Sequence, residues 1–535
     1  MPKRIEITKE NFYDQMIRHG FLYEQIPRCF TADSFADNAN KLLKHVQTNT
    51  KKHTAPFTMS IYKNALSRRS VSIPNPYSFA VAVKFLRSKW PLVKELTTSA
   101  NSQSPITFIA SYDDSSIEYL NSEHAREAAH AHSDFVPNTL ERNALALGRT
   151  VKLSIDLHTF YDSIYTHSLA WAICGKPEAK RFHSTKLPPH PINYDFADAL
   201  DRLTRNMKSG ETNGILTGPY TSRIFSELLL AGIDRLLVER GYIFTRYVDD
   251  FSFYFETDPE ARQAISDIED IVREFGLKIN HDKTQIEPFP FDVLSNMKPR
   301  LERALQADGV FGLLNEASLL HLEGEKGAYK YALKMLRNVD SINREDAVVS
   351  LLFNIGLSDP KQCCFVTEYM RSHIEQLDHH RLSAALNPLL QRALKAKREQ
   401  EIVNLLSIGR ELGLPILGES IAASIESHND LSRIIALDYW KHAKSLVVRS
   451  PGEAQRINEA VKKLQSALTN ESFDGEHWLL LLESENKSLL SIDRASGNSD
   501  SFIEKMTSSG VSLYKQIRKP DRTGAFTSLT SFYRL

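Results

Sequence analysis

The stretch Tyr242–Phe255, Tyr-Ile-Phe-Thr-Arg-Tyr-Val-Asp-Asp-Phe-Ser-Phe-Tyr-Phe, decides the fold of this chain. Its two flanks, Tyr242–Tyr247 and Phe251–Phe255, are short and rich in aromatic residues, which is typical of β-strands. Asp249 and Asp250 lie between these flanks, so the stretch predicts a hairpin with two adjacent carboxylates at its turn. Neighbouring carboxylates repel each other, and a divalent cation such as Mg²⁺ relieves that repulsion. The pattern therefore predicts a metal site that handles phosphate.

A second acidic pair, in Tyr112-Asp113-Asp114, tests how specific this pattern is. Serines flank the pair at Ser111, Ser115 and Ser116, and its spacing is one residue short. Such polar surroundings favour a solvated turn. The strand context, rather than the short motif, therefore distinguishes Asp249-Asp250.

A third carboxylate ends another strand-like segment. Val151–Asp156 alternates apolar and polar residues and ends in Asp156, and an aromatic turn containing Tyr161 follows before a helix start. Two-metal phosphoryl transfer needs carboxylates from more than one strand, so that cations ~3.5–4 Å apart are bridged. Asp156, Asp249 and Asp250 are therefore the predicted catalytic and metal-binding residues. An N-capping or turn aspartate is the alternative interpretation of Asp156.

Two further segments carry candidate phosphate contacts. Gly214 and Gly218 lie in a loop before an amphipathic helix, where the absence of Cβ lets the backbone approach a nucleotide closely. Arg223 would then be free to reach phosphate. After the hairpin, a helical stretch over 261–275 and a short strand lead to Lys283, a candidate for contact with a nucleotide phosphate. An ordinary loop and a solvated lysine are the alternative interpretations.

In this order, the segments resemble the palm of reverse transcriptases. Asp156 and Tyr161 match motif A, and the other matches are Gly214–Gly218 to motif B, Tyr247–Asp250 to motif C and Asn280–Thr284 to motif D. Arg69 with Ser72–Pro76 resembles the fingers segment that precedes the palm. The resemblance implies a two-metal polymerase in which Tyr161 excludes a ribose 2′-hydroxyl. The nucleotide-binding residues that it implies are Tyr161, Gly218, Arg223, Tyr247 and Lys283.

Within that family, Thr217–Ile224 is most similar to the bacterial abortive-infection, phage-defence reverse transcriptases of the AbiK and P2-prophage types. This resemblance implies a homo-oligomeric, Mg²⁺-dependent DNA polymerase with two ions, with Mn²⁺ as an alternative. It also implies synthesis from dNTPs without a template, primed by a tyrosine of the enzyme and leaving the DNA covalently attached. The N-terminal candidates for the priming residue are Tyr13, Tyr23, Tyr62 and Tyr77.

Several departures keep other functions open. Leu216-Thr217 stands where template-copying reverse transcriptases usually carry Pro-Gln, which disfavours templated copying. Arg126, Arg142 and Arg149 are equal candidates for the arginine that grips the incoming triphosphate. The alternatives are a templated, retron-like RNA-directed DNA polymerase, a non-catalytic nucleic-acid-binding scaffold and an enzyme that makes a small-molecule nucleotide signal. Three retained carboxylates disfavour the scaffold, and a small-molecule enzyme leaves Tyr161 unexplained.

Composition limits the partners and the compartment. The 535 residues contain 66 basic and 66 acidic side chains, so the whole molecule is not expected to be steered towards nucleic acid. The segment from Lys41 to Glu95, however, contains eleven lysines and arginines and only one acidic residue. This excess of basic residues predicts either a phosphate-binding surface or a solvated basic face. Four unpaired cysteines and the absence of a long apolar run predict a soluble cytoplasmic protein without membrane contact.

The expected fold is an α+β reverse-transcriptase palm and fingers over residues 1–290, followed by an all-α helical-repeat domain over 291–535. Strand signals fade beyond residue 290, and paired helical segments separated by Gly, Pro or Asn-Asp suggest a HEAT-like array. The predicted helical segments there are 329–336, 347–355, 382–394 and 401–412. A basic, aromatic tail that runs to Leu535 has no assigned role.

Overall fold

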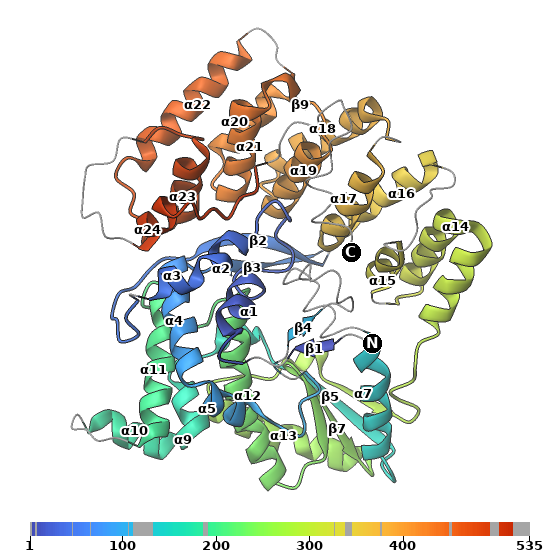
Figure 1. Ribbon diagram of the computed structural model, residues 1–535. Helices are drawn as coiled ribbons and strands as arrows, with labels where there is room; N and C mark the ends of the chain where they lie inside the picture. The colour runs from blue at the N-terminus through green and yellow to red at the C-terminus, as the bar shows by residue number, and fades with distance from the viewer. Residues whose placement is uncertain are drawn as a thin grey trace. The chain divides into compact units, whose positions relative to one another are not determined.

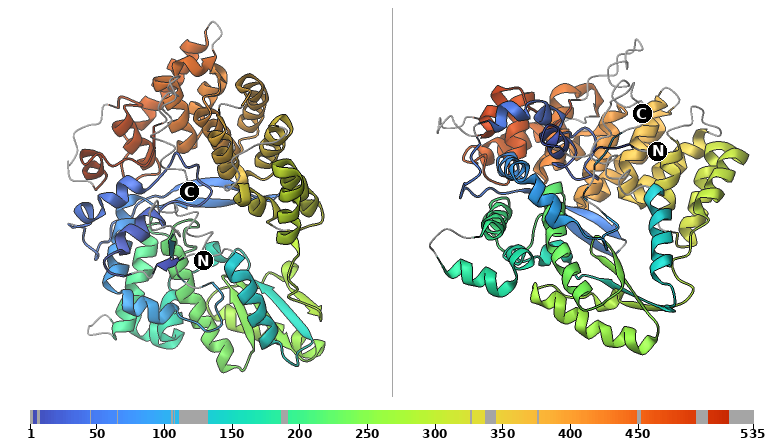
Figure 2. Two further views of the ribbon diagram at one scale, coloured as in Figure 1. Left: turned by 45° about the vertical axis from the view of Figure 1, so that its right-hand side comes forward. Right: turned by 60° about the horizontal axis from the view of Figure 1, so that its bottom comes forward.

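The computed structural model divides the chain into two compact units (Figures 1 and 2). It describes residues 3–5, 8–44, 46–64, 66–104, 106, 108–110, 132–185, 191–325, 327–336, 345–374, 377–448, 452–492 and 502–516. The first unit comprises residues 1–24, 32–56 and 72–294, and the second comprises 25–31, 57–71 and 295–535. The second acidic pair at Asp113-Asp114, Arg126 and the C-terminal tail lie outside the described residues.

A four-stranded antiparallel sheet lies at the centre of the first unit, in the order β6-β7-β5-β8. Its strands are β5 (Val151–Asp156), β6 (Phe244–Tyr247), β7 (Asp250–Phe255) and β8 (Gln285–Pro288). A separate two-stranded sheet pairs β1 (Lys3–Ile5) with β4 (Phe108–Ala110). The predicted strand at 151–156 coincides with β5.

The two faces of the central sheet differ in chemistry because side chains alternate along each strand. Leu153 of β5 is directly opposite Phe253 of β7, and Ile155 is opposite Phe251; all four are buried. Directly opposite residues share a face, so these pairs form one apolar layer. Asp156 follows Ile155 and therefore falls on the other face of the sheet.

Helices account for most of the rest of the first unit, and α13 lies against the sheet (Figure 1). Helix α13 (Asp258–Glu274) packs against β5, β7 and β8, and it begins with a capping box formed by Thr257 and Glu260. Helix α12 (Tyr220–Glu239) packs against α5, α9 and α13. The other helices are α1 (Phe12–Arg18), α2 (Asp33–Asp37), α3 (Ala39–Leu43), α4 (Pro76–Ser88), α5 (Trp90–Thr97), α7 (His132–Leu145), α8 (Phe160–Ser163), α9 (Ser168–Cys174), α10 (Lys176–Ser184), α11 (Ile192–Asn206) and the 3₁₀ helix η1 (His281–Lys283).

The second unit is largely helical. Its helices are α14 (Met297–Leu322), α15 (Ala328–Met335), α16 (Glu345–Ser358), α17 (Cys363–Ser372), α18 (His379–Lys395), α19 (Glu399–Glu411), α20 (Gly418–Glu426), α21 (Asp430–His442), α22 (Glu453–Leu468), α23 (Trp478–Lys487) and α24 (Phe502–Ser508). Helices two apart in sequence also pack together, as α17 with α19, α18 with α20 and α19 with α21. Such stacking suits a helical array, and its HEAT-like character stays a prediction.

Two N-terminal segments join the second unit for identifiable reasons. Strand β2 (Phe57–Asn64), which pairs with β3 (Ser67–Ile73), meets the start of α19, where Tyr62 N–H donates to Gln400 Oε1 (2.7 Å). Arg68 binds the Glu401 carboxylate with two nitrogens, at 2.8 and 2.7 Å. These side chains cover a strand edge that would otherwise be open to pairing. A single boundary near residue 290, as expected from the sequence, does not place these N-terminal segments in the second unit.

The second such segment pairs with the C-terminal end of the described chain. Thr31 N–H donates to the carbonyl of Leu513 (2.8 Å), and Lys515 N–H donates to that of Cys29 (2.7 Å). Tyr514 is buried between these bonds, and its hydroxyl donates to Asp438 Oδ2 (3.0 Å). Residues 25–31 therefore belong with the helices of the second unit.

Two further observations concern the cysteines and the membrane. Cys29, Cys174, Cys363 and Cys364 are all free thiols. Within the described ranges, every helix is too short or too polar to cross a bilayer.

Candidate active site

The structure brings the three predicted carboxylates together at one end of the two inner strands of the central sheet. Asp156, the last residue of β5, is directly opposite Asp250, the first residue of β7. Asp249 lies in the two-residue turn between β6 and β7. Both acids were expected in the turn, but Asp250 already belongs to the strand. This places its side chain in register with Asp156.

Asp249 and Asp250 are the acids whose pKa the site perturbs. Partial burial, with Asp249 and Asp156 beside it, raises the pKa of Asp250 to about 6. Burial and the nearby Asp156 also raise the pKa of Asp249. A proton or a cation therefore relieves a real repulsion here, because the ionised forms are crowded in a partly desolvated place.

Lys283 and Asn280 hold the third carboxylate. Lys283 Nζ lies 3.1 Å from both oxygens of Asp156, and Asn280 Nδ2 donates to Asp156 Oδ2 (2.8 Å). The Asn280 N–H also donates to the Asp156 carbonyl (2.8 Å), which ties η1 to the end of β5. The lysine side chain is 54% exposed. The ammonium group of Lys283 here neutralises the Asp156 carboxylate, and its contact with phosphate stays a prediction.

The chemistry of this donor set fits a divalent cation. Carboxylate oxygens are the ligands that Mg²⁺ prefers, and the raised pKa values show how poorly the acids tolerate one another without a counter-charge. Among the residues that the structure describes, no three His, Cys, Asp or Glu side chains are grouped as a ready metal cluster. Asp156 is engaged by Lys283, so a cation would take the place of that ammonium group.

Tyr161 lies next to the acids. Its hydroxyl is 3.4 Å from Ser226 Oγ on α12, and its carbonyl accepts from the N–H of Ile215 (2.9 Å). Burial raises the pKa of Tyr161, with Asp249 among the charges that it feels. The Tyr161 hydroxyl thus contacts α12, and its backbone is bound to the loop that contains Gly214.

The glycines of the preceding loop are required by the chain itself. Gly218 has φ +135°, and a Cβ there would lie 2.6 Å from the carbonyl oxygen of Ser72. Ser72 N–H donates to the Thr217 carbonyl (2.7 Å), which holds the two segments together. Gly214 likewise has no room for a Cβ, because the Asp162 carbonyl oxygen would be 2.9 Å away. Internal packing thus accounts for both positions, apart from any role with a nucleotide.

The environment of Arg223 differs from the one that the sequence predicts. Its side chain is 13% exposed, and its guanidinium donates to Glu227 Oε2 (2.7 Å) and to Ser104 Oγ (3.0 Å). The expected free side chain reaching for phosphate is therefore replaced by a buried, paired one. Burial on a helix beside an acid four residues away explains the difference. Tyr247, by contrast, is 40% exposed, opposite Asp250 on β6.

The remaining candidates are placed as follows. Tyr13, Tyr23, Tyr62 and Tyr77 are all half-buried, so exposure does not single out one of them. Arg142 pairs with Asp292, and Arg149 donates to the carbonyl of Leu147.

Part of the basic run is engaged within the protein. Lys84 Nζ donates to the carbonyls of Leu43 and Val46, and Arg68 pairs with Glu401. These two charges stabilise the fold, and the phosphate-binding surface stays a prediction for the rest of the run.

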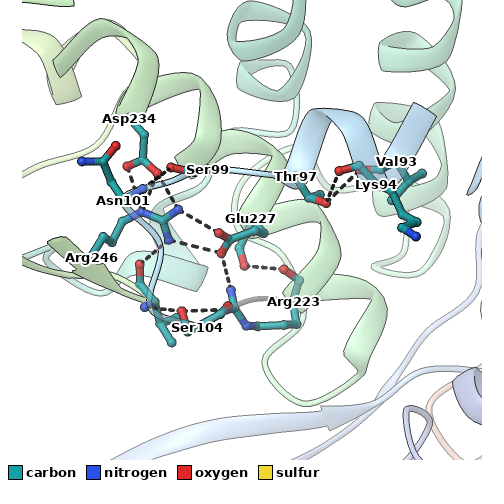
Figure 3. A network of polar contacts seen from close by, with 12 residues as sticks. Val93, Lys94, Thr97, Ser99, Asn101, Ser104, Arg223, Glu227, Asp234 and Arg246 are labelled. Carbon is teal, nitrogen blue, oxygen red and sulfur yellow. Dashed lines mark hydrogen bonds and ion pairs between the residues drawn. The ribbon is translucent and has the colours of Figure 1, made fainter. Parts of the chain in front are cut away.

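The sequence reasoning missed the charged residues beneath the turn. Arg246 is completely buried and pairs with Glu227 and Asp234 of α12 (Figure 3). A signal existed, because two acids seven residues apart stand among the apolar residues of the helix, and an arginine interrupts an aromatic strand. Their spacing places both acids on one helix face.

The pKa of Asp250 predicts how stability changes with pH. Folding raises this pKa above the unfolded value of ~3.9, so the ionised carboxylate destabilises the fold above pH ~6, and protonation removes that cost as the pH falls towards ~4. In metal-free buffer, D250N should therefore be more stable than the wild type at pH 7.5, by about 1 kcal/mol after allowance for solvent screening. The advantage should shrink between pH 6 and 4 in thermal unfolding.

Asp270, on the exposed side of α13, supplies the matched control. D270N should stay within ~0.5 kcal/mol of the wild type. A D250N variant that is no more stable at pH 7.5, or whose advantage persists at pH 4, would contradict the crowding described above.

Comparison with known proteins agrees with this geometry. Residues 117–296, about a third of the chain, match the family described as reverse transcriptase (RNA-dependent DNA polymerase). No curated protein matches the chain in sequence. Among solved structures, it is similar to Candida albicans telomerase in complex with a fragment of telomeric RNA, at 12% identity and a TM-score of 0.27, covering 61% of this chain and 63% of that one. It is also similar to apo telomerase from Candida tropicalis, at 13% identity and a TM-score of 0.30, covering 77% and 70%.

The chain thus spans less than two thirds of the length of the first telomerase, and similarity at these scores is too remote to indicate activity or partners. The family match and the geometry of the site do not depend on this similarity to telomerases. The match over residues 117–296 supports a reverse-transcriptase domain in this part of the chain, and with it a nucleotidyltransferase that resembles RNA-directed DNA polymerases.

Proposed function

We propose that the chain is a Mg²⁺-dependent DNA polymerase that extends DNA from dNTPs. The observation that carries this proposal is the register of β5 and β7, which sets Asp156 opposite Asp250 with Asp249 beside them. Carboxylates from two strands, in a domain matched by reverse transcriptases, support two-metal phosphoryl transfer.

Each side chain has a proposed role. Asp156, Asp249 and Asp250 would hold two Mg²⁺ ions, with Mn²⁺ as an alternative. Bound there, the ions supply activation of the attacking hydroxyl and stabilisation of the leaving pyrophosphate. The ammonium group of Lys283 would leave its ion pair with Asp156 and bind a phosphate of the incoming nucleotide instead.

Synthesis without a template, primed by a tyrosine of the enzyme, is the proposed mode. Leu216-Thr217 in the loop before α12 supports it, since template-copying reverse transcriptases usually carry Pro-Gln there. The second candidate is templated, RNA-directed synthesis, which the family description favours. The two modes share the metal site and differ in what supplies the first hydroxyl. They are therefore separable by following where the label goes.

The labelling experiment uses the full chain with Mg²⁺ and each labelled dNTP, with and without template-primer, on a denaturing protein gel. We expect label that stays with the polypeptide without template, because a tyrosine hydroxyl would be the first acceptor. Single substitutions to phenylalanine then identify the acceptor, because the label should be lost when the priming tyrosine is replaced. The four positions to replace are Tyr13, Tyr23, Tyr62 and Tyr77.

D249A should abolish incorporation, and D270A, which removes an exposed aspartate of the same unit, should preserve it. Label found only in free DNA, and only with template, would establish the templated mode instead. Incorporation that persists in D249A would remove the proposed site, and a wild type without any incorporation would leave a nucleic-acid-binding scaffold.

Tyr161 provides a second prediction, on sugar selection. The Tyr161 ring would collide with a ribose 2′-hydroxyl, so Y161A should raise the use of rNTPs relative to dNTPs by about tenfold or more, as steric exclusion from a tight site gives. Y161F is the matched control, because it keeps the ring and removes only the contact with Ser226. The ratio of kcat/KM for rNTP and dNTP measures the effect. An unchanged preference for dNTPs over rNTPs in Y161A would rule out this role of Tyr161.

We further propose that the enzyme acts in antiphage abortive infection, as a cytoplasmic homo-oligomer. The sequence Thr217–Ile224 supports this through its resemblance to phage-defence reverse transcriptases. Bacteria that express the wild-type chain should give fewer phage plaques than bacteria that express D249A, while D270A should protect like the wild type. Equal plaque counts for wild type and D249A across a phage panel would reject this role. Gel filtration would report the oligomeric state.

A further inference from the structure

The hairpin that carries Asp249 and Asp250 turns through a residue with an unfavourable backbone conformation. Val248 has φ +55°, in the left-handed region that β-branched residues avoid. Side chains bind both of its polar backbone groups. The Val248 N–H donates to Ser104 Oγ (2.9 Å), and its carbonyl accepts from Nη1 of Arg246 (2.9 Å). The turn is thus held in one conformation by groups other than the turn itself.

Arg246 uses all of its hydrogen-bond donors. Nε and Nη2 donate to the Asp234 carboxylate (2.9 and 2.7 Å), and Nη2 and Nη1 donate to Glu227 (2.8 and 3.2 Å). The bond from Nη1 to Val248 accounts for the fifth N–H. Because the guanidinium is planar and completely buried, these bonds leave it one orientation. Helix α12 therefore determines where the Val248 carbonyl lies.

Ser104 is held by the same helix through a second branch (Figure 3). Arg223 Nη2 donates to Ser104 Oγ (3.0 Å), and Arg223 Nη1 donates to Glu227 Oε2 (2.7 Å). Ser104 is buried and accepts from both Arg223 and Val248. Glu227 thus joins two arginines, one leading to the carbonyl of Val248 and the other, through Ser104, to its N–H.

We infer that Ser104, Arg223, Glu227, Asp234 and Arg246 form a turn clamp that positions Asp249 and Asp250 against Asp156 for cation binding. This inference rests on the proposed function, because it assigns the clamp to the proposed metal site. The members are positioning residues: they contact Val248, and Val248 sets the direction of the two acids that follow it. Two guanidinium groups balance two carboxylates, so the clamp places the acids without adding net charge beside them.

Stability alone does not account for this network. A buried ion network contributes no more to stability than apolar packing of the same volume, and often less. The rest of α12 is packed in that apolar way, through Leu228, Leu229, Leu230 and Ile233. What an apolar replacement would lack is the pair of bonds to Val248. The geometry therefore assigns the network to the conformation of the turn.

S104A is the decisive variant, because it removes the acceptor of the Val248 N–H and leaves all four charged residues in place. We expect about five- to tenfold weaker Mn²⁺ binding in an electron paramagnetic resonance titration, the effect of one hydrogen bond. The shift of the unfolding midpoint by Mg²⁺ should fall in parallel. In polymerisation, kcat should fall more than KM for dNTP rises, because substrate contacts are untouched.

V248G tests the mechanism in the same background. Glycine adopts positive φ without steric cost, so the turn would need less support. S104A/V248G should therefore recover most of the Mn²⁺ affinity that S104A loses. A merely structural serine would give no such recovery. Full affinity in S104A, or a loss that glycine does not reverse, would overturn the clamp.

Two controls complete the design. S424A removes another buried serine, whose hydroxyl donates to the Ser420 carbonyl, and R410M breaks another buried ion pair, with Asp438. Both should leave Mn²⁺ affinity at the wild-type value in the folded protein, whatever they do to stability. The proposed function fails if the wild type binds no Mn²⁺, or if D249A binds Mn²⁺ as well as the wild type does. If the wild type binds and S104A binds equally, only the clamp fails.

Discussion

Repulsion between carboxylates at the ends of two neighbouring inner strands is the constraint on which the first unit depends. Asp156 and Asp250 are directly opposite each other, an arrangement that destabilises a strand pair, and Asp249 adds a third charge. The opposite face of the same strands compensates, because Ile155 and Phe251 are buried there. Each such side chain contributes roughly 1.5–3 kcal/mol. The apolar layer thus holds the acids together.

Local strain and local charge are arranged around the same point. Val248 in the left-handed region costs on the order of 1–3 kcal/mol, and the bonds from Arg246 and Ser104 offset that cost. Lys283 and Asn280 balance Asp156 from the other side. Strain and unfavourable charge gather at functional sites because the surrounding fold over-determines them. The end of the β5–β7 strand pair that carries Asp156 and Asp250 has both properties.

Particular residues show why sequence patterns succeeded in some places and failed in others. The strand at 151–156 and the helices of the second unit follow from periodicity, which is a local property. The contact between Arg223 and Ser104, 119 residues apart, forms only after folding, whereas Glu227 lies four residues from Arg223 on the same helix, a spacing that the sequence shows. The exchange of residues 25–31 and 57–71 into the second unit likewise depends on contacts between segments hundreds of residues apart.

The sequence by itself determined the strand at 151–156, the hairpin around Asp249 and Asp250, the three acids and their resemblance to a polymerase, since residue type and spacing carry that information. Only the tertiary structure decided the register that sets Asp156 against Asp250, the lysine that neutralises Asp156, and the charged network under Val248. The physical reason is distance along the chain. Contacts between remote residues depend on how elements pack, and the spacing of residues within one segment does not identify the segment that packs against it.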